Sequence, residues 1–256
     1  MRVLGIDIGS RETKFALSDN GVITKLHSIS TMNFYKNWCK KEDSIYFDPE
    51  LIGFKNIDVM VSTGYGRNNS ALKGFLPINE IKAHVFGALK QHKITDFTLI
   101  DIGGQDVKIV SVENGIIMDM VLNEKCAASS GRFLENMAAL LEISIEELAT
   151  YHENPVTLNS TCSVFAESEL IGKISEGVDA PSIYAGINFA LYNKIKPSFS
   201  KFITDTAIIS GGVAKNKAVI KYMKNDFKNI IISKTPEYNG AIGCCFHGER
   251  SIKNEK

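Results

Sequence analysis

The same short pattern of residues occurs twice in this chain, and it constrains the fold more than any other feature. Residues 3–8 are an apolar run interrupted by Asp7 and followed by the turn residue Gly9, and residues 97–103 repeat the pattern around Asp101. The two aspartates stand 94 residues apart, and each pattern leads into a return strand and an Asn-Gly pair typical of a hairpin turn. This duplication predicts an α/β fold with two similar mixed sheets, helices outside them and a cleft between two lobes.

The remaining pattern suggests where the lobes begin and end. We expect residues 1–95 to form the first lobe, with a C-terminal helix at 240–256 packing back on it, and residues 96–239 to form the second. Residues 31–56 show weak periodicity, so no element is assigned there. The polar tail from Arg250 is expected to be frayed. Helices are predicted from apolar periodicity and capping residues at 81–91, 132–141, 163–177, 180–196, 216–223 and 240–249.

Composition excludes several classes of function. The 256 residues include 29 basic and 29 acidic side chains, so a neutral surface gives no reason to expect nucleic acid or an anionic membrane as partner. No apolar stretch approaches the length of a membrane span, and Asp7 interrupts the first apolar run too early for a signal peptide. Five cysteines without an export signal indicate a reducing cytoplasm, with free or metal-bound thiols.

Three glycine turns are candidates for binding nucleotide phosphates. A turn glycine lets backbone N–H groups face an anion, and Asp7 is suited to hold Mg²⁺ or to orient a nucleophile. The second turn adds Gln105, whose amide could position an attacking water, and the third is Gly211-Gly212 at a predicted strand-to-helix junction. Each turn alone is typical of ordinary turn chemistry, but three together favour nucleotide binding. Neither a P-loop nor a Rossmann glycine pattern is present.

Two cysteines stand apart from the rest. Cys126 and Cys162 lie 36 residues apart in small, polar surroundings, and each precedes a predicted helix, whose N-terminus stabilises a thiolate. They could simply be small buried residues. Alternatively, they are half of the four thiolates of an iron–sulfur cluster, and a second copy of the chain would supply the others. Residues 244–245 are adjacent cysteines better explained by packing, and the five histidines show no ligand spacing, His84 fitting an amphipathic helix.

These features together resemble a known family. The chain resembles the ATP-dependent activators, or component A, of 2-hydroxyacyl-CoA dehydratases, which are related to the ATPase subunits of benzoyl-CoA reductase. The resemblance spans nearly the whole chain, and its two cysteine motifs are specific to that group. The matching motifs lie at 5–10, 63–67, 100–108, 126–135, 160–169, 211–214 and 238–243.

The resemblance implies a fold and an activity. The fold would be that of the actin-like ATPases, shared with sugar kinases and the 70-kDa heat-shock chaperones, with two ribonuclease-H-like lobes and a nucleotide cleft. The protein would be a homodimer that shares one [4Fe–4S] cluster, bound by Cys126 and Cys162 of each chain. With Mg²⁺ and ATP, which becomes ADP, it would drive one electron onto an iron–sulfur dehydratase or reductase, taking that electron from ferredoxin or flavodoxin.

The resemblance also implies roles for individual residues. Asp7, Asp101 and Gln105 would be catalytic, with Gln105 near the γ-phosphate. The phosphates and nucleoside would be contacted by residues of the three turns and their surroundings, namely Gly9, Ser10, Thr13, Lys14, Gly103, Gly104, Gly211, Gly212 and Asn216. Four departures from the family pattern are visible: Arg11-Glu12 replaces small residues, Ser129-Ser130-Gly131 stands where Gly-Thr-Gly is usual, Glu237 stands where a glutamine often contacts the base, and residues 31–56 lack the clear helix expected there.

Two other functions remain open at this level. The first is a small-molecule kinase of the same fold, such as an amino-sugar kinase, with Asp101 or Asp106 as the base; it leaves the cysteine motifs unexplained. The second is a nucleotide-regulated binding module without turnover, which the substitutions at 11–12 and 129–130 would favour. The sequence does not identify the acceptor of the electron.

Overall fold

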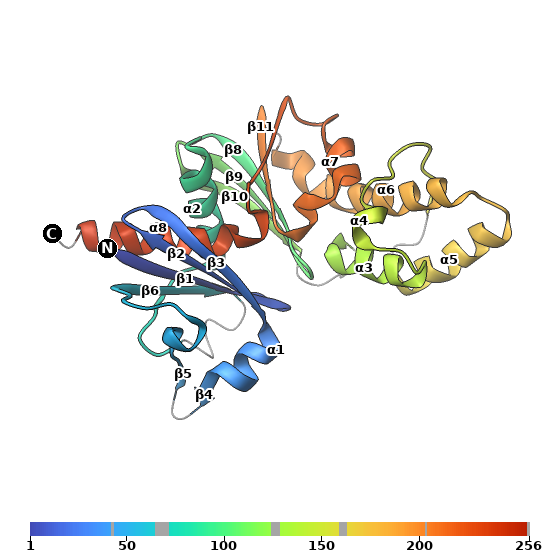
Figure 1. Ribbon diagram of the computed structural model, residues 1–256. Helices are drawn as coiled ribbons and strands as arrows, with labels where there is room; N and C mark the ends of the chain where they lie inside the picture. Colours follow the sequence, from blue (N-terminus) through green and yellow to red (C-terminus); the bar gives the residue numbers. More distant parts are fainter. Residues whose placement is uncertain (42–43, 65–71, 124–128, 159–162, 203, 255–256) are drawn as a thin grey trace. The chain divides into compact units, whose positions relative to one another are not determined.

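The chain folds into two compact units, each built on a five-stranded sheet. The structure is a computed structural model and describes residues 1–41, 44–64, 72–123, 129–158, 163–202 and 204–254 (Figure 1). The first unit comprises Met1–Thr95 and Glu237–Lys256, and the second comprises Asp96–Pro236. The second unit is therefore a continuous segment inserted into the first.

The sheet of the first unit has the strand order β3-β2-β1-β6-β7. Its first three strands form an antiparallel meander, and β6 and β7 then add in parallel to β1. The middle strand β1 reads as a nearly continuous apolar run because both of its faces are covered. The strands are β1 (Arg2–Ile8), β2 (Glu12–Asp19), β3 (Val22–Ser30), β6 (Val59–Gly64) and β7 (Leu76–Pro77).

One face of this sheet is covered by the segment whose structure the sequence pattern left unassigned. Phe34, Phe47 and Phe54 are fully buried there around Phe15 of β2, with ring centroids 5.7–5.9 Å from that of Phe15. Aromatic burial of this kind supplies the packing that local periodicity did not reveal. The elements are α1 (Thr31–Asn33), the π-helix η1 (Phe34–Trp38), β4 (Cys39–Lys41), β5 (Ile45–Phe47) and the 3₁₀-helix η2 (Pro49–Ile52).

The other face is covered by two helices, α2 (Glu80–His92) and α8 (Asn239–Asn254), which pack on each other (Figure 1). Helix α8 approaches β1 closely because Gly5 has no side chain; a Cβ there would overlap the carbonyl of Ala241. The expectation of a frayed tail was wrong, since α8 continues to Asn254. The guanidinium of Arg250 lies over the ring of Phe86, 5.6 Å from its centroid, and holds this last part of the helix on α2.

The sheet of the second unit repeats the first, with the order β10-β9-β8-β11-β12. Asp101 stands opposite Lys108 across the β8–β9 hairpin, as Asp7 stands opposite Lys14 across β1–β2. The predicted Asn114-Gly115 hairpin turn is confirmed. The strands are β8 (Phe97–Ile102), β9 (Val107–Glu113), β10 (Ile116–Asn123), β11 (Thr206–Ser210) and β12 (Asn229–Ile232).

Helices of the second unit enclose an apolar core on one face of its sheet. Helices of this unit are capped by side chains: that of Ser144 accepts from the N–H of Glu147, and that of Asp179 accepts from the N–H of Ser182. None of the helices in the described part of the chain combines the length and hydrophobicity needed to cross a bilayer. The helices are α3 (Gly131–Leu140), α4 (Ile145–Leu148), α5 (Ser163–Ser175), α6 (Ala180–Phe199) and α7 (Lys217–Met223), with short 3₁₀ turns at η4 (Ser200–Phe202), η5 (Gly212–Lys215) and η6 (Pro236–Tyr238).

Candidate functional site

The first glycine turn lies at the end of β1 and is closed by hydrogen bonds. The N–H of Gly9 donates to the carbonyl of Glu12 at 3.1 Å, and its own carbonyl accepts from the hydroxyl of Thr31 at 2.7 Å. A side chain at Gly9 would crowd the carbonyl of Glu12 at 2.8 Å, so the tight turn requires glycine. Asp7 precedes this turn and is buried, with 5% of its surface exposed.

The three residues expected at phosphates beside this turn differ in accessibility. Ser10 is exposed and Lys14 is half-buried, whereas Thr13 is completely buried and its hydroxyl lies 3.2 Å from that of Thr31. The ammonium of Lys14 lies above Gly9, 3.5 Å from the point that a Cβ on that glycine would occupy. Among the described residues, Lys14 has no ion-pair partner. A cation of this kind beside a glycine turn is available to an anionic ligand.

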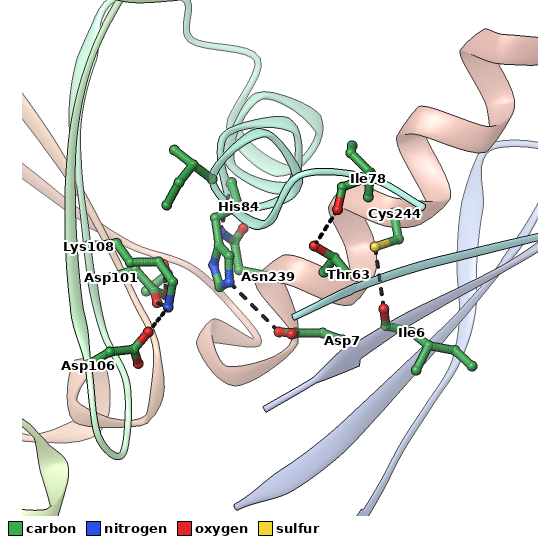
Figure 2. Close-up of polar contacts among 12 residues, drawn as sticks. Ile6, Asp7, Thr63, Ile78, His84, Asp101, Asp106, Lys108, Asn239 and Cys244 are labelled. Atoms are coloured by element: carbon green, nitrogen blue, oxygen red, sulfur yellow. Dashed lines mark hydrogen bonds and ion pairs between the residues drawn. The ribbon is translucent and has the colours of Figure 1, made fainter. Parts of the chain in front are cut away.

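Asp7 faces a histidine that the sequence analysis did not assign to a site. Figure 2 shows the imidazole of His84, from α2, opposite the carboxylate of Asp7; Nε2 and Oδ2 are 3.8 Å apart and both side chains are 8% exposed. Gly240, at the start of α8, lies against both groups. A Cβ on Gly240 would overlap the carboxylate and lie 3.0 Å from Nε2 of His84.

The equivalent aspartate of the second unit has different partners. Asp101 is 2% exposed; its Oδ2 lies 3.6 Å from the ammonium of Lys108, and its Oδ1 accepts from the hydroxyl of Ser210 at 2.6 Å. Lys108 also pairs with Asp106 in the following turn (Figure 2). The charge of Asp101 is therefore offset by a buried ammonium from its own unit.

The turn after β8 is joined directly to helix α3. The N–H of Gly131 donates to the carbonyl of Gly103, and that of Arg132 donates to the carbonyl of Gly104, each at 2.9 Å. The hydroxyl of Ser130 donates to the same Gly104 carbonyl at 3.0 Å. These bonds use N–H groups at the start of α3 that have no partner within the helix. Gln105, at the tip of this turn, is exposed.

The third turn begins at Gly211, directly after β11. Its φ is +81°, and a Cβ there would overlap the carbonyl of Ile102, so only glycine fits. Gly64 occupies the same place in the first unit, with φ +104° and the same kind of overlap with Ile8. Gly212 is exposed and has open space around the position of a Cβ. The 3₁₀ turn η5 follows Gly211, and the helix predicted at 216–223 is confirmed as α7, which begins at Lys217.

Asn216 and Glu237 lie at opposite ends of the segment that follows this turn. Asn216 is 4% exposed, and both ends of its amide are bonded: Oδ1 caps α7 by accepting from Val219, and Nδ2 donates to Asn188 at 2.8 Å. Asn188 in turn donates to the carbonyl of Leu148 at 2.7 Å. Glu237 is half-buried in the 3₁₀ turn η6, at the point where the chain re-enters the first unit.

The three described cysteines are unsuited to bind metal. Burial raises the pKa of Cys39 to about 11, that of Cys245 to about 12, and that of Cys244 well above its ordinary value. Because metals bind the thiolate, a raised thiol pKa works against metal binding at these three positions. Within the described ranges, no group of three or more histidine, cysteine or acidic side chains is arranged to hold a metal ion.

Cys126 and Cys162 fall outside the described residues, but their flanks are described. The amide of Asn123, at the end of β10, donates to the hydroxyl of Ser129 at 2.7 Å, so the two ends of the segment that holds Cys126 are joined. Helix α5 begins at Ser163, the residue after Cys162. Two thiols from each chain match half of the ligand set of a [4Fe–4S] cluster.

Sequence reasoning missed two charged or polar partners of the aspartates, His84 and Lys108. Lys108 could have been found, because it follows Asp101 at the same interval at which Lys14 follows Asp7. His84 could not have been found this way, because its contact with Asp7 joins positions that are far apart in the chain and has no counterpart in the duplicated pattern.

Two relatives of known function are similar to this chain over almost its whole length. The 2-hydroxyisocaproyl-CoA dehydratase activator of Clostridioides difficile is 32% identical over 263 residues, which cover 100% of this chain and 98% of the relative. The (R)-2-hydroxyglutaryl-CoA dehydratase activating ATPase of Acidaminococcus fermentans is 32% identical, with 95% of each chain covered.

Solved structures confirm the predicted fold. The activator of the 2-hydroxyisocaproyl-CoA dehydratase from Clostridium difficile, solved with bound ADPNP, matches with a TM-score of 0.85 and 30% identity, covering 100% of this chain and 97% of that one. The fold is therefore that of the actin-like ATPases, with two sheet-containing lobes. A model of the BadF/BadG/BcrA/BcrD ATPase family matches residues 4–247. On this evidence the chain belongs to the BadF/BadG/BcrA/BcrD ATPase family.

Proposed function

We propose that this chain is an ATP-hydrolysing iron–sulfur activator, which delivers a low-potential electron to a 2-hydroxyacyl-CoA dehydratase or a related iron–sulfur reductase. The observation that carries the proposal is the likeness, over the whole chain, to two activators of such dehydratases. Membership of an ATPase family supports ATP as the substrate and ADP as the product. The dehydratase partner follows from the same relatives.

In the first unit, Gly9, Ser10 and Lys14 would bind phosphate. This assignment is supported by the tight turn at Gly9 and by the uncompensated ammonium of Lys14 beside it. Thr13 would act by holding the turn through Thr31, since its hydroxyl is buried. Asp7 would orient Mg²⁺ or the attacking water, and Mg²⁺ would supply neutralisation of the phosphate charge.

In the second unit, the turn at Gly103-Gly104 would bind phosphate and the exposed amide of Gln105 would position the water. Asp101 would act with its charge partly offset by Lys108. A nucleoside would approach the backbone at Gly211-Gly212, where Gly212 leaves open space, with Glu237 near the base. Asn216 would contribute by fixing the start of α7, because both ends of its amide are engaged within the protein.

Cys126 and Cys162 would hold the cluster together with the same residues of a second copy. The cluster would supply a store for one electron. The hydrogen bond between Asn123 and Ser129 joins the described residues on either side of the segment that contains Cys126. Helix α5, which starts directly after Cys162, leaves Phe165, Ile171 and Ile174 between 50% and 70% exposed. Apolar side chains exposed to this extent on one helix support contact with another chain, as a cluster-sharing homodimer requires.

The hydrogen bonds between the Gly103-Gly104 turn and α3 support a connection between ATP hydrolysis and electron transfer from the proposed cluster. The segment that contains Cys126 ends where α3 begins, and the N-terminus of α3 is bonded to the turn that would bind phosphate. A change in the turn on ATP hydrolysis would therefore act on the helix that follows Cys126.

Anaerobic preparation of the protein tests the proposal. We expect brown protein with roughly four iron and four sulfide per two chains, and a strong loss of both in Cys126→Ser and Cys162→Ser but not in the control Cys39→Ser. ATP hydrolysis should fall in Asp7→Asn, Asp101→Asn and Gln105→Ala. Colourless, iron-free protein, or full colour and paramagnetic signal in Cys126→Ser, would contradict the cluster.

Two further measurements separate the alternatives. Sugar-stimulated ATP consumption with a phosphorylated product would indicate a kinase, and nucleotide binding without hydrolysis would indicate a binding module. Reduction of a purified dehydratase by the protein with ATP, using ferredoxin or flavodoxin as donor, would identify the activator directly.

A further inference from the structure

The two equivalent aspartates are held by different partners, and this difference points to a role for His84. In the second unit, Asp101 is fixed by Lys108 on one side and by Ser210 on the other. A buried carboxylate that lacked such partners would be costly. The positions that correspond to these partners in the first unit follow from the strand register.

Neither of the corresponding residues, Lys14 and Thr63, pairs with the carboxylate of Asp7. Lys14 stands opposite Asp7 in register, but its ammonium lies over Gly9 and makes no ion pair with Asp7. Thr63 is next to Asp7 on the parallel strand β6, but its hydroxyl donates to the carbonyl of Ile78 at 2.9 Å. Within the described part of the chain, the side chain that faces the carboxylate of Asp7 is instead His84, whose Nε2 lies 3.8 Å from Oδ2.

The surroundings of this pair fix its position. The amide of Asn239, the first residue of α8, donates to the backbone carbonyl of His84 at 2.8 Å and accepts from the amide of Gln91 at 2.9 Å. These two hydrogen bonds hold the start of α8 against α2. The next residue, Gly240, then lies directly against Asp7 and His84, where any side chain would displace them.

We propose that His84 is a positioning residue, which holds the carboxylate of Asp7 in the orientation needed for ATP hydrolysis, and that Gly240 must be glycine to leave room for this pair. The inference rests on the proposed role of Asp7 in ATP hydrolysis. His84 acts through Asp7 and not on the nucleotide itself.

Substitutions at His84 give the first test, read as steady-state ATP hydrolysis at saturating Mg²⁺. In His84→Ala we expect kcat to fall by roughly ten- to a hundredfold, as a displacement of about 1 Å in a catalytic group does, while KM for ATP changes by less than about twofold. His84→Gln should restore most of kcat, because its amide N–H can take the place of the ring Nε2. The control His92→Gln, on the same helix, should match the wild type.

Gly240→Ala gives the second test, in which neither Asp7 nor His84 is itself substituted. The new methyl group would meet the carboxylate of Asp7 and the imidazole of His84, which are ends of side chains and can shift, so the protein should still fold, with a thermal midpoint somewhat below that of the wild type. Its kcat should nevertheless fall as in His84→Ala. The control Gly172→Ala, in α5, adds a methyl group that meets nothing within 4 Å and should leave kcat unchanged.

The outcomes distinguish this inference from the proposed function. If Asp7→Asn abolishes hydrolysis but His84→Ala and Gly240→Ala keep full kcat, the inference is overturned and the function stands. Equal impairment of His84→Gln and His84→Ala would also overturn it. If Asp7→Asn retains full activity, or if the wild type hydrolyses no ATP, the proposed function fails first.

Discussion

The backbone N–H of Gly131 donates to the carbonyl oxygen of Gly103 at 2.9 Å, so the helix that follows Cys126 begins on a turn that follows the buried strand β8. Ser130 reinforces this contact through Gly104. The departure from Gly-Thr-Gly at residues 129–131 therefore retains a hydroxyl at the position that bonds to the turn. If the proposed function holds, this contact would make the junction between turn and helix a place where ATP hydrolysis and electron delivery can be separated by mutation.

Ser130→Ala should uncouple the two activities. It removes one hydrogen bond to Gly104, worth about 1 kcal/mol or roughly a fivefold change in an equilibrium, while the bond from Arg132 remains. We expect ATP hydrolysis to persist and the number of ATP molecules consumed per electron delivered to increase. Ser200→Ala, which loses a comparable hydroxyl-to-carbonyl bond at the end of α6, is the control. An unchanged ratio in Ser130→Ala would show that the junction does not couple the two activities.

Gly211 and Gly212 should respond oppositely to alanine. Gly211→Ala forces a side chain into a left-handed conformation and against the carbonyl of Ile102, and should lower the free energy of unfolding by at least about 2 kcal/mol. Gly212→Ala meets no atom within 4 Å and should change stability by less than about 0.5 kcal/mol, yet weaken ATP binding. Urea unfolding and a nucleotide titration measure the two effects. Equal stability of the two variants would refute the strain at Gly211.

Removing the ammonium from Asp101 should destabilise the second unit. Lys108→Met leaves a buried carboxylate without its cation, which should cost on the order of 3–5 kcal/mol in the free energy of unfolding. Adding Asp101→Asn to the same chain removes the unpaired charge and should recover much of that loss. Denaturant titrations of the two single variants and the double variant give the coupling energy. Additive effects would mean that the pair does not interact.

The cysteines should differ in reactivity according to their surroundings. With a pKa of about 11, roughly one Cys39 thiol in a thousand is a thiolate at pH 8, and its alkylation rate should rise about tenfold per pH unit until that pKa is reached. Cys244 and Cys245 are buried and should stay unmodified until the protein is unfolded. Mass spectrometry after iodoacetamide treatment, with and without denaturant, checks this. Rapid labelling of Cys245 in the folded protein would contradict the packing of α8 on β1.

Much of the sheet architecture could be predicted from the sequence because it depends on local signals. The Asn-Gly turns, the apolar runs and the glycine turns define both meanders, and the predicted apolar run at 97–103 matches β8 to within a residue. Residues 31–56 could not be assigned, since their order comes from aromatic contacts such as that between Phe34 and Phe15, which join distant parts of the chain. The π-helix η1 has no recognised sequence period.

The candidate site, too, could be predicted only where its residues follow a local sequence pattern. The aspartates and turn glycines repeat in the sequence and could be found there, whereas the contacts that hold them could not. Asp7 and His84 meet because α2 packs on α8 over one face of the sheet, and Gly240 lies against both because α8 follows the second unit in the chain. The C-terminal end of α8 could likewise not be predicted, because the contact between Arg250 and the ring of Phe86 joins residues that are far apart in the chain.

The packing of α8 on Gly5 has a consequence for biosynthesis. The first unit is completed only by the last residues of the chain, whereas the second unit is one unbroken segment. On the ribosome, the inserted segment can reach its final structure while the face of β1 that receives Cys244 and Cys245 still lacks its cover. Truncation of α8 should therefore give chains whose second unit is folded and whose first unit is incomplete and recognised by chaperones and proteases.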